Sequence, residues 1–115
     1  MNHMKPTKIG FKEKVTFVGT KKEKTVLARI DTGAKRCSIG RALAEEIGTG
    51  KIIELKKVKS SMGETDRPIV KLLIKIAGRN IRAYCSIADR AKLKYPALIG
   101  RNVLKRGFVV EENEK

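Results

Sequence analysis

The sequence TVLARIDTGAKRCSI, residues 25–39, contains the motif around which the rest of the chain is expected to fold. In its first part, Val26, Ala28 and Ile30 alternate with larger or charged neighbours. This period of two predicts a β-strand that opens into a turn at Asp31. Because the strand would hold the acid rigidly, Asp31 is a candidate catalytic carboxylate.

The three residues that follow Asp31 have side chains that suit a turn close to a catalytic group. The hydroxyl of Thr32 can fix the loop, and Gly33 is expected to adopt a backbone conformation that a Cβ would resist. Ala34 is small enough to let another chain pass close by. Such a loop suits peptide hydrolysis by two aspartates that share one proton, although Asp-Thr-Gly also occurs in ordinary turns.

One loop provides only half of such a site. The sequence contains a single Asp-Thr-Gly, and its other aspartates, Asp66 and Asp89, lie in different local contexts. The second carboxylate would therefore come from a second copy of the chain. A two-fold axis between two Asp31 side chains gives a symmetric pair, as expected of an isologous homodimer.

A second motif lies in YPALIGRNVL, residues 95–104, where the apolar pair Leu98 and Ile99 precedes Gly100, Arg101 and Asn102. The two motifs, about 70 residues apart and in this order, resemble those of the retropepsins, the homodimeric aspartic proteases typified by retroviral enzymes. In that family an apolar strand enters D-T-G-A. An apolar pair then precedes G-R-N or G-R-D at the start of a short helix.

Three further stretches narrow the resemblance: GETDRP at 63–68, ADR at 88–90 and YPALIGRN at 95–102. They are similar to a cellular branch of retropepsin-like proteins described as ATP-dependent zinc proteases. Its members are often associated with an ATP-grasp ligase that adds glutamates to a ribosomal protein. The resemblance covers approximately residues 11–110.

The resemblance implies an all-β fold, the retropepsin-like closed barrel of the acid proteases, with one or two short helices and assembly as a homodimer. The expected domain covers residues 11–110. Residues 1–10 are expected to be disordered or partly of cloning origin, and residues 111–115 form a charged, frayed tail. Residues 108–110 are expected at the dimer interface, with terminal disorder as the alternative.

The same resemblance assigns roles within the site. Asp31 of each subunit would act as acid or base. The loop would be supported by Thr32 and Gly33. Substrate would contact Ala34, Lys35, Arg36 and a hairpin flap that includes Ser61, Met62 and Gly63. Structural support from behind would come from Ile99, Gly100, Arg101 and Asn102, with Arg101 bracing the interior. An ordinary exposed hairpin is the alternative to a flap.

The sequence lacks a suitable set of zinc ligands and a phosphate-binding motif for ATP. The only histidine is His3, the cysteines Cys37 and Cys85 are far apart, and no GxxxxGK[ST] motif is present. We therefore predict that the chain binds neither group and needs no cofactor. Cys85 is expected to be a buried small hydrophobe. A thiol at Cys37, close to two cations, could have a lowered pKa and be sensitive to oxidation.

Charge is the main compositional signal. With 27 Lys and Arg against 12 Asp and Glu, the formal net charge is +15, which favours polyanionic partners such as nucleic acid, ribosomes or acidic peptides. Only 4% of residues are aromatic, so a platform for base stacking is poorly supplied. The sequence contains no apolar run long enough to indicate a membrane span, so a soluble cytoplasmic protein is expected.

Charge beside the catalytic motif departs from the retroviral pattern. In retroviral enzymes, acidic residues follow D-T-G-A, bind the substrate backbone and pair with the arginine of G-R-N. Here Lys35 and Arg36 take those positions, so Arg101 must find another partner. Four cations beside a dyad should lower its apparent pKa values and attract an acidic peptide. A glutamate-rich tail on a ribosomal protein is therefore a candidate substrate.

Two other functions are compatible with the same sequence. One is a non-catalytic basic module of the same fold that binds ribosome, RNA or an acidic protein. The other is a monomer in which Asp31 is a structural relic. The resemblance also implies the glutamate ligase as a partner.

Overall fold

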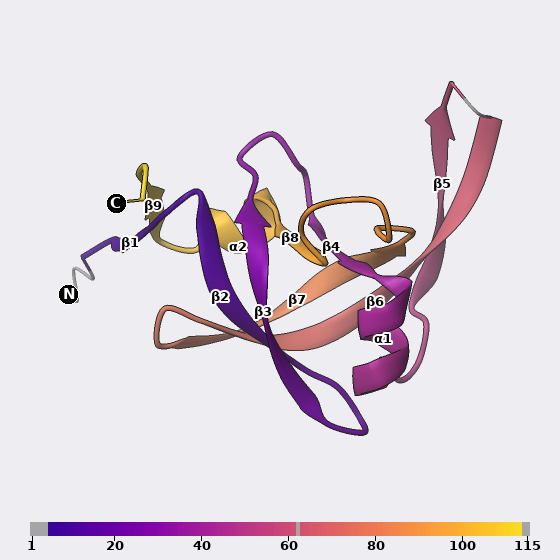
Figure 1. Cartoon of the computed structure of the whole chain (residues 1–115), viewed down its shortest axis with the longest axis horizontal. Coiled ribbons are helices and arrows are strands. Elements are labelled where there is room, and N and C mark those ends of the chain that lie inside the picture. The colour runs from indigo at the N-terminus through magenta and orange to yellow at the C-terminus, as the bar shows by residue number, and fades with distance from the viewer. Residues whose placement is uncertain (1–4, 62, 114–115) are drawn as a thin grey trace.

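The computed structural model describes residues 5–61 and 63–113 as strands and two short helices, in the arrangement drawn in Figure 1. The strands are β1 (Thr7–Ile9), β2 (Lys12–Val18), β3 (Glu23–Ile30), β4 (Cys37–Gly40), β5 (Glu54–Ser60), β6 (Gly63–Ile76), β7 (Arg79–Ala88), β8 (Ala97–Ile99) and β9 (Phe108–Val110). The helices are α1 (Arg41–Ile47) and α2 (Arg101–Leu104).

Six of these strands close into a barrel. They follow the order β2-β3-β8-β4-β7-β6, and a pairing between β2 and β6 closes the circle. Most neighbours run antiparallel, but β3 pairs with β8 and β4 with β7 in parallel. The expected all-β closed barrel with short helices is therefore confirmed.

Alternating side chains on the strands fill the barrel. Val15 and Phe17 of β2 and Ala28 of β3 are fully buried, as the period of two predicts. Burying a valine- or phenylalanine-sized side chain contributes about 1.5–3 kcal/mol, so this interior is the main source of stability. Cys85 of β7 is also fully buried, which confirms the prediction of its place in the core.

Helix α1 begins directly after β4. Ser38 lies inside β4, which continues to Gly40. Gly40 occupies the N-cap position in an extended conformation, without a side-chain cap. The side chain of Ile39 in this strand is fully buried and forms part of the core.

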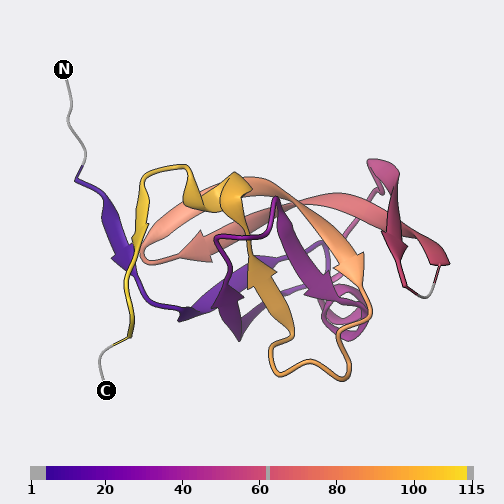
Figure 2. The ribbon, with the colours of Figure 1, turned by 90° about the horizontal axis from the view of Figure 1, so that it is seen from above.

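The two ends of the described chain lie together. β1 and β9 form a separate two-stranded parallel sheet, which is visible beside the barrel in Figure 2. The expectation that residues 1–10 are disordered is therefore wrong for Thr7–Ile9, while residues 1–4 lie outside the described residues.

The tail also contributes contacts. Oδ1 of Asn113 accepts a hydrogen bond from the backbone N–H of Phe11 at 2.8 Å, and its Nδ2 donates to the Lys12 carbonyl at 3.1 Å. Residues 111–113 are thus anchored rather than frayed. The prediction that residues 108–110 form a dimer interface is not tested by this pairing within one chain.

The hairpin of β5 and β6 extends away from the barrel (Figure 1). Its register pairs Ser60 with Gly63, so the two strands are joined within the predicted segment. β6 starts at Gly63 and runs through Pro68. Proline fits there because β7 starts to pair with β6 only from Ile69 onward.

None of the described helices has the length and apolar character needed to cross a bilayer.

Candidate active site

Asp31 lies immediately after β3, at the point predicted from the sequence. Its backbone N–H donates to the carbonyl of Ile99 at 2.9 Å, and Ile30 is the parallel partner of Ile99 in the pairing of β3 with β8. The apolar pair of the second motif therefore runs beside β3 and holds the start of the loop. The fold brings the two motifs together as expected.

The loop positions one carboxylate oxygen of Asp31. Oδ1 accepts the backbone N–H of Gly33 at 2.9 Å, and the Asp31 carbonyl accepts the N–H of Ala34 at 3.2 Å. Gly33 does not have the positive φ that would favour glycine, so the predicted conformational reason is wrong. The need for glycine is one of space, because a Cβ there would lie 3.2 Å from Oδ1.

The second motif supports the loop through its backbone. The N–H groups of Arg101 and Asn102 donate to the carbonyls of Ala34 and Lys35 at 2.8 and 3.2 Å. This close approach depends on Gly100, because a Cβ there would lie 2.5 Å from the carbonyl oxygen of Arg36. Gly100 and the two residues after it thus contact the loop closely through their backbone.

Arg101 has a different position from the one expected. Its side chain is exposed rather than buried in the interior, so the prediction that it braces the interior is wrong. Nη1 donates to the carbonyl of Thr32 at 3.2 Å. With basic residues in place of the usual acids, the guanidinium binds a backbone carbonyl and holds the loop from outside. The side chain of Thr32 is exposed on the same loop.

Asn102 connects three segments. Its Oδ1 accepts the backbone N–H of Cys37 at 3.1 Å and the Cys37 thiol at 3.4 Å. Its Nδ2 donates to the carbonyl of Tyr84 on β7 at 2.9 Å. The side-chain amide therefore links α2, the strand after the loop, and β7.

A pocket of about 380 Å³ opens beside the loop, and we call it the cationic pocket. Its wall includes Ala34 of the loop and the buried Ser38. Five basic residues line it: Lys35, Arg36, Lys56, Arg67 and Arg90. Asp89 is the acidic residue in the lining. The two predicted cations beside Asp31 are thus part of a larger basic cluster.

Burial and neighbouring arginines both act on the pKa of Arg90. Burial lowers the pKa of its guanidinium, the charges of Arg29 and Arg67 lower that pKa further, and the charge of Asp31 opposes the shift. Arg90 is fixed by donating from Nε to the carbonyl of Tyr95 at 3.0 Å. An anion in this pocket would relieve the repulsion among the arginines.

Ser38 adds an unsatisfied polar group to the cationic pocket. Its side chain is only 8% exposed, and within the described part of the chain its hydroxyl has no hydrogen-bond partner. A buried hydroxyl without a partner is costly, so a ligand oxygen or a water molecule is expected to complete it.

The predicted flap contributes its base to the pocket. Lys56 and Val58 of β5 and Arg67 and Ile69 of β6 line the wall, whereas Ser61 and Gly63 lie at the far end of the hairpin. Met62 lies outside the described residues. Substrate contact by these three tip residues stays a prediction that the structure does not test.

Ser38, Lys56, Arg67 and Arg90 are among the pocket residues that were not identified from the sequence. A signal existed for two of them. Once the two strands are joined within the predicted segment, Lys56 pairs with Arg67 in the hairpin register. The positions of Ser38 and Arg90 depend on how β4 and the segment after β7 meet across the barrel, which sequence spacing does not reveal.

The two cysteines lie opposite each other in the parallel pairing of β4 with β7, and both are buried and free. A hydrogen bond with the Cys85 thiol lowers the pKa of Cys37, while burial opposes this and the Gly100 backbone and Arg106 assist. The same hydrogen bond and burial raise the pKa of Cys85. The expected direction for Cys37 is thus found, but its cause is the other thiol rather than Lys35 and Arg36.

No cluster of three or more His, Cys, Asp or Glu side chains that could hold a metal occurs among residues 5–61 and 63–113.

Solved structures with a similar fold come from a bacterium and two viruses. The protein Lpg0085 (DUF785) of Legionella pneumophila, of unknown function, has a TM-score of 0.64 at 20% identity over 92% of this chain and 93% of its own. The protease of Simian Foamy Virus (mac) has a TM-score of 0.61 at 20% identity over 82% and 91%. EIAV protease, complexed with the inhibitor HBY-793, has a TM-score of 0.63 at 20% identity over 91% and 90%. These matches show the retroviral protease-like fold.

Among curated proteins no sequence match was found. A family model described as "RimB-like: Retropepsin-like aspartic endopeptidase RimB" matches residues 42–115, which is more than half of the chain. The match includes the second motif and the hairpin, and it starts after the Asp31 loop. The chain therefore belongs to the RimB-like family of retropepsin-like aspartic endopeptidases.

Proposed function

We propose that the chain acts as a homodimeric aspartic endopeptidase whose catalytic dyad consists of Asp31 from each of two copies. The observation that carries this proposal is the position of Asp31, at the opening of β3 and held by the Ile99 carbonyl and the Gly33 N–H. A loop with one carboxylate is half of the required chemistry. A second copy supplies the other half without any further residue.

In the proposed reaction, one Asp31 is ionised and the other carries the shared proton, because two adjacent carboxylates resist ionising together. The ionised carboxylate removes a proton from water, whose oxygen attacks the scissile carbonyl carbon. The protonated partner donates to the carbonyl oxygen. Proton transfer to the amide nitrogen then lets the C–N bond break. The hydrogen bond from the Gly33 N–H to Oδ1 of Asp31 orients the carboxylate for these transfers.

We further propose that the substrate is an acidic peptide. Arg36, Lys56 and Arg67 line the cationic pocket, and the hydroxyl of Ser38 can donate to a carboxylate there. A glutamate-rich tail of a ribosomal protein in the cytoplasm is the proposed substrate, because its carboxylates would complement the basic residues of this pocket. The association of the resembling cellular branch with a glutamate ligase supports the same choice. The ligase or the ribosome would then be a partner.

Cleavage of matched peptides tests the substrate proposal. Peptides with the same scissile residues but glutamate, lysine or glutamine flanks should be cleaved in the order acidic, neutral, basic. The variant Lys56→Glu should reduce the preference for the acidic peptide by about 2- to 5-fold, as expected for one partly exposed charge. Lys14→Glu on β2 is a matched control. Equal cleavage of acidic and basic peptides would contradict the proposal.

A non-catalytic basic module is the second candidate, and the net charge of +15 favours it. Such a module would bind ribosome, RNA or an acidic protein. Its binding would weaken steeply with salt and would survive Asp31→Asn. Absence of cleavage by a protein of confirmed dimeric mass, together with such binding, would favour this function over the protease.

A further inference from the structure

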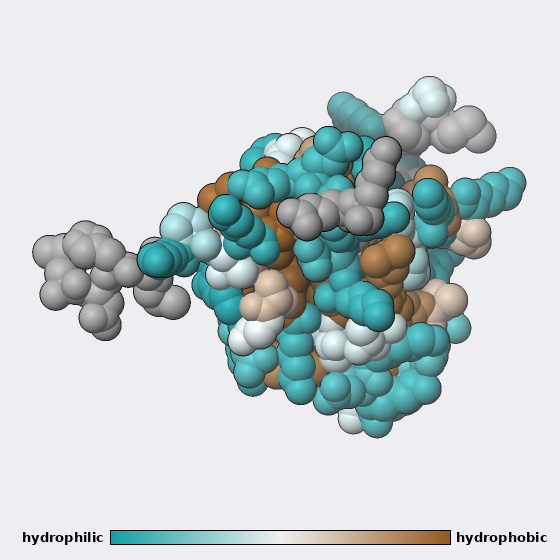
Figure 3. All heavy atoms as spheres, turned by 60° about the vertical axis from the view of Figure 1, so that its left-hand side comes forward, coloured by the Kyte–Doolittle hydropathy of each residue, from teal (hydrophilic) through white to brown (hydrophobic). Residues whose placement is uncertain are grey.

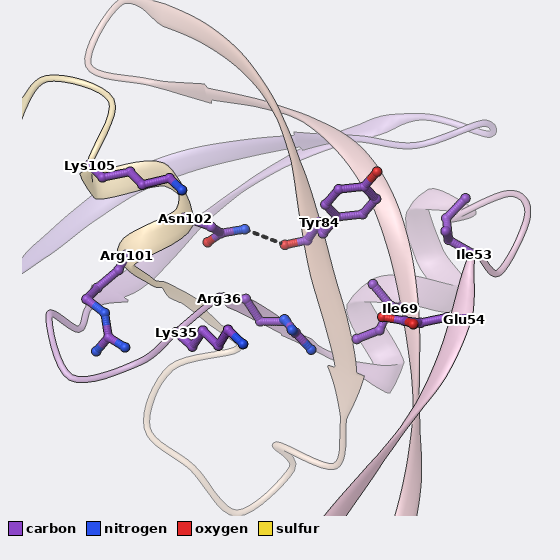
Figure 4. Close-up of a pocket in the computed structure, with 9 residues that line it drawn as sticks. All are labelled: Lys35, Arg36, Ile53, Glu54, Ile69, Tyr84, Arg101, Asn102 and Lys105. Atoms are coloured by element: carbon purple, nitrogen blue, oxygen red, sulfur yellow. Dashed lines mark hydrogen bonds between the residues drawn. The ribbon is translucent and has the colours of Figure 1, made fainter.

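A second pocket of about 470 Å³ shares Lys35 and Arg36 with the cationic pocket, and we call it the distal pocket. Figure 4 shows its nine lining residues. Ile53 and Glu54 lie on the β5 side, Tyr84 comes from β7, and Arg101, Asn102 and Lys105 come from α2 and its end. The protease reaction described above makes no use of this pocket.

The two pockets are neighbours. Lys35, Arg36 and Ile69 line both, so an extended peptide that lies along these side chains would contact the cationic pocket and the distal pocket. Ala34 of the Asp31 loop lines the cationic pocket and is not among the residues that line the distal pocket.

We propose that the distal pocket is a second peptide-binding site, which holds a segment of the substrate outside the cleaved region. Its occupant is an apolar side chain flanked by carboxylates. The inference rests on the proposed function, since the occupant is part of the same peptide whose scissile bond lies at Asp31.

An apolar surface supports the first half of this assignment. Ile53 is 53% exposed and Tyr84 is 46% exposed, and both present their side chains to the pocket beside Ile69. The ammonium of Lys71 lies 5.4 Å from the centre of the Tyr84 ring. Large apolar side chains that are exposed together at a concave surface are typical of a binding site, because a ligand removes them from water.

Charge supports the second half. Four cations, Lys35, Arg36, Arg101 and Lys105, line the pocket with one carboxylate, Glu54. Within the described residues none of the four cations forms an ion pair. The apolar and cationic side chains thus occur together in the lining of this pocket, and an alternation of hydrophilic surface with apolar patches is also seen on the face of the molecule in Figure 3. A peptide with both apolar and acidic groups complements the lining of the distal pocket better than a purely acidic one.

The pocket is also tied to the catalytic loop. Asn102 donates from Nδ2 to the Tyr84 carbonyl at 2.9 Å, and the Arg101 guanidinium donates to the Thr32 carbonyl at 3.2 Å. These bonds fix the pocket relative to Asp31. In a symmetric dimer the pocket would occur twice, so a substrate extended on either side of the scissile bond would meet one copy.

Peptides of two lengths test the proposal. The short peptide contains only the acidic residues around the scissile bond, and the long one is extended at both ends by an isoleucine flanked by glutamates. The variants Tyr84→Ala and Lys105→Glu should each raise KM for the long peptide by about tenfold and leave its kcat unchanged. Cleavage of the short peptide should not change. The matched controls Leu27→Ala and Lys14→Glu, on the outer surface of β2 and β3, should change neither.

A binding arm separates this inference from the protease proposal. In the Asp31→Asn background, fluorescence anisotropy should show that the labelled long peptide binds more tightly than the short one, and that Tyr84→Ala or Lys105→Glu removes the difference. Absence of cleavage by wild type would contradict the protease function and leave this comparison intact. Equal affinity for both peptides, or equal weakening of both by the variants, would overturn the distal site.

Discussion

Asn102 accepts the backbone N–H of Cys37 on Oδ1 at 3.1 Å, across 65 residues of sequence, and so joins the end of the second motif to the strand that follows the Asp31 loop. The same side chain donates to the Tyr84 carbonyl. Two motifs that are separate in the sequence thus become one hydrogen-bonded unit. Because Asn102 is half-buried, water replaces these bonds poorly when the side chain is removed.

We predict that Asn102→Ala lowers the free energy of unfolding by about 1–3 kcal/mol, because the Cys37 N–H and the Tyr84 carbonyl lose their partners. Urea denaturation measures the change. Asn80→Ala, at an exposed position of β7, is the control and should change stability by less than about 0.5 kcal/mol. Equal effects of the two substitutions would show that the bonds to Asn102 contribute little.

Gly100 should tolerate no larger residue. In Gly100→Ala, the new Cβ would meet the Arg36 carbonyl oxygen at 2.5 Å, and the Ala34 carbonyl oxygen at 2.9 Å. Because both are backbone atoms, the loop must move, and the Asp31 geometry moves with it. We expect loss of activity and a lower midpoint of thermal unfolding. A variant with wild-type activity and midpoint would contradict the close packing of the two motifs.

The turn between β6 and β7 contains a strained residue. Ala77 has φ of 49°, in the left-handed region, and Gly78 follows with φ of 77°. Asparagine adopts this conformation more readily than alanine, and Asn-Gly is a preferred pair for such hairpin turns. Ala77→Asn should raise the free energy of unfolding by about 0.5–1 kcal/mol, measured in urea. A decrease would show that the turn does not need this conformation.

Glu46 makes stability depend on pH. Hydrogen bonds from Lys24 and then Lys22 lower the pKa of its carboxyl group. A carboxyl whose pKa is lower in the folded state stabilises the protein above its unfolded pKa, and this contribution disappears as pH falls through the folded pKa. The stability difference between wild type and Glu46→Gln should therefore be present at neutral pH and vanish in acid. A difference that is constant with pH, in urea titrations, would contradict this linkage.

The barrel could be predicted because local patterns and global fold agree. The alternation at Val26, Ala28 and Ile30 marks a strand wherever it occurs, and the turn before Gly63 fixes the hairpin register. The order of the two motifs indicated the fold family. These signals depend on short-range periodicity, which the sequence displays directly.

Other features depend on contacts between distant segments. The pairing of β1 with β9 needs the two ends of the chain to meet, and segments of only three residues give no sign of it. The outward position of Arg101 follows from the carbonyl it binds. The cationic pocket arises where β4, the β5–β6 hairpin and the residue Arg90 converge, so only three-dimensional placement reveals the unpartnered hydroxyl of Ser38.

Subunit mixing tests the proposed dyad most directly. Wild type and Asp31→Asn are unfolded together, refolded at varying ratios and fixed total concentration, and assayed for peptide cleavage after the dimeric mass is confirmed by sedimentation. If each active site needs Asp31 from two copies, Asp31→Asn alone is inactive and activity falls as the square of the wild-type fraction. Activity that falls in simple proportion to that fraction, or that persists in pure Asp31→Asn, would contradict the shared dyad.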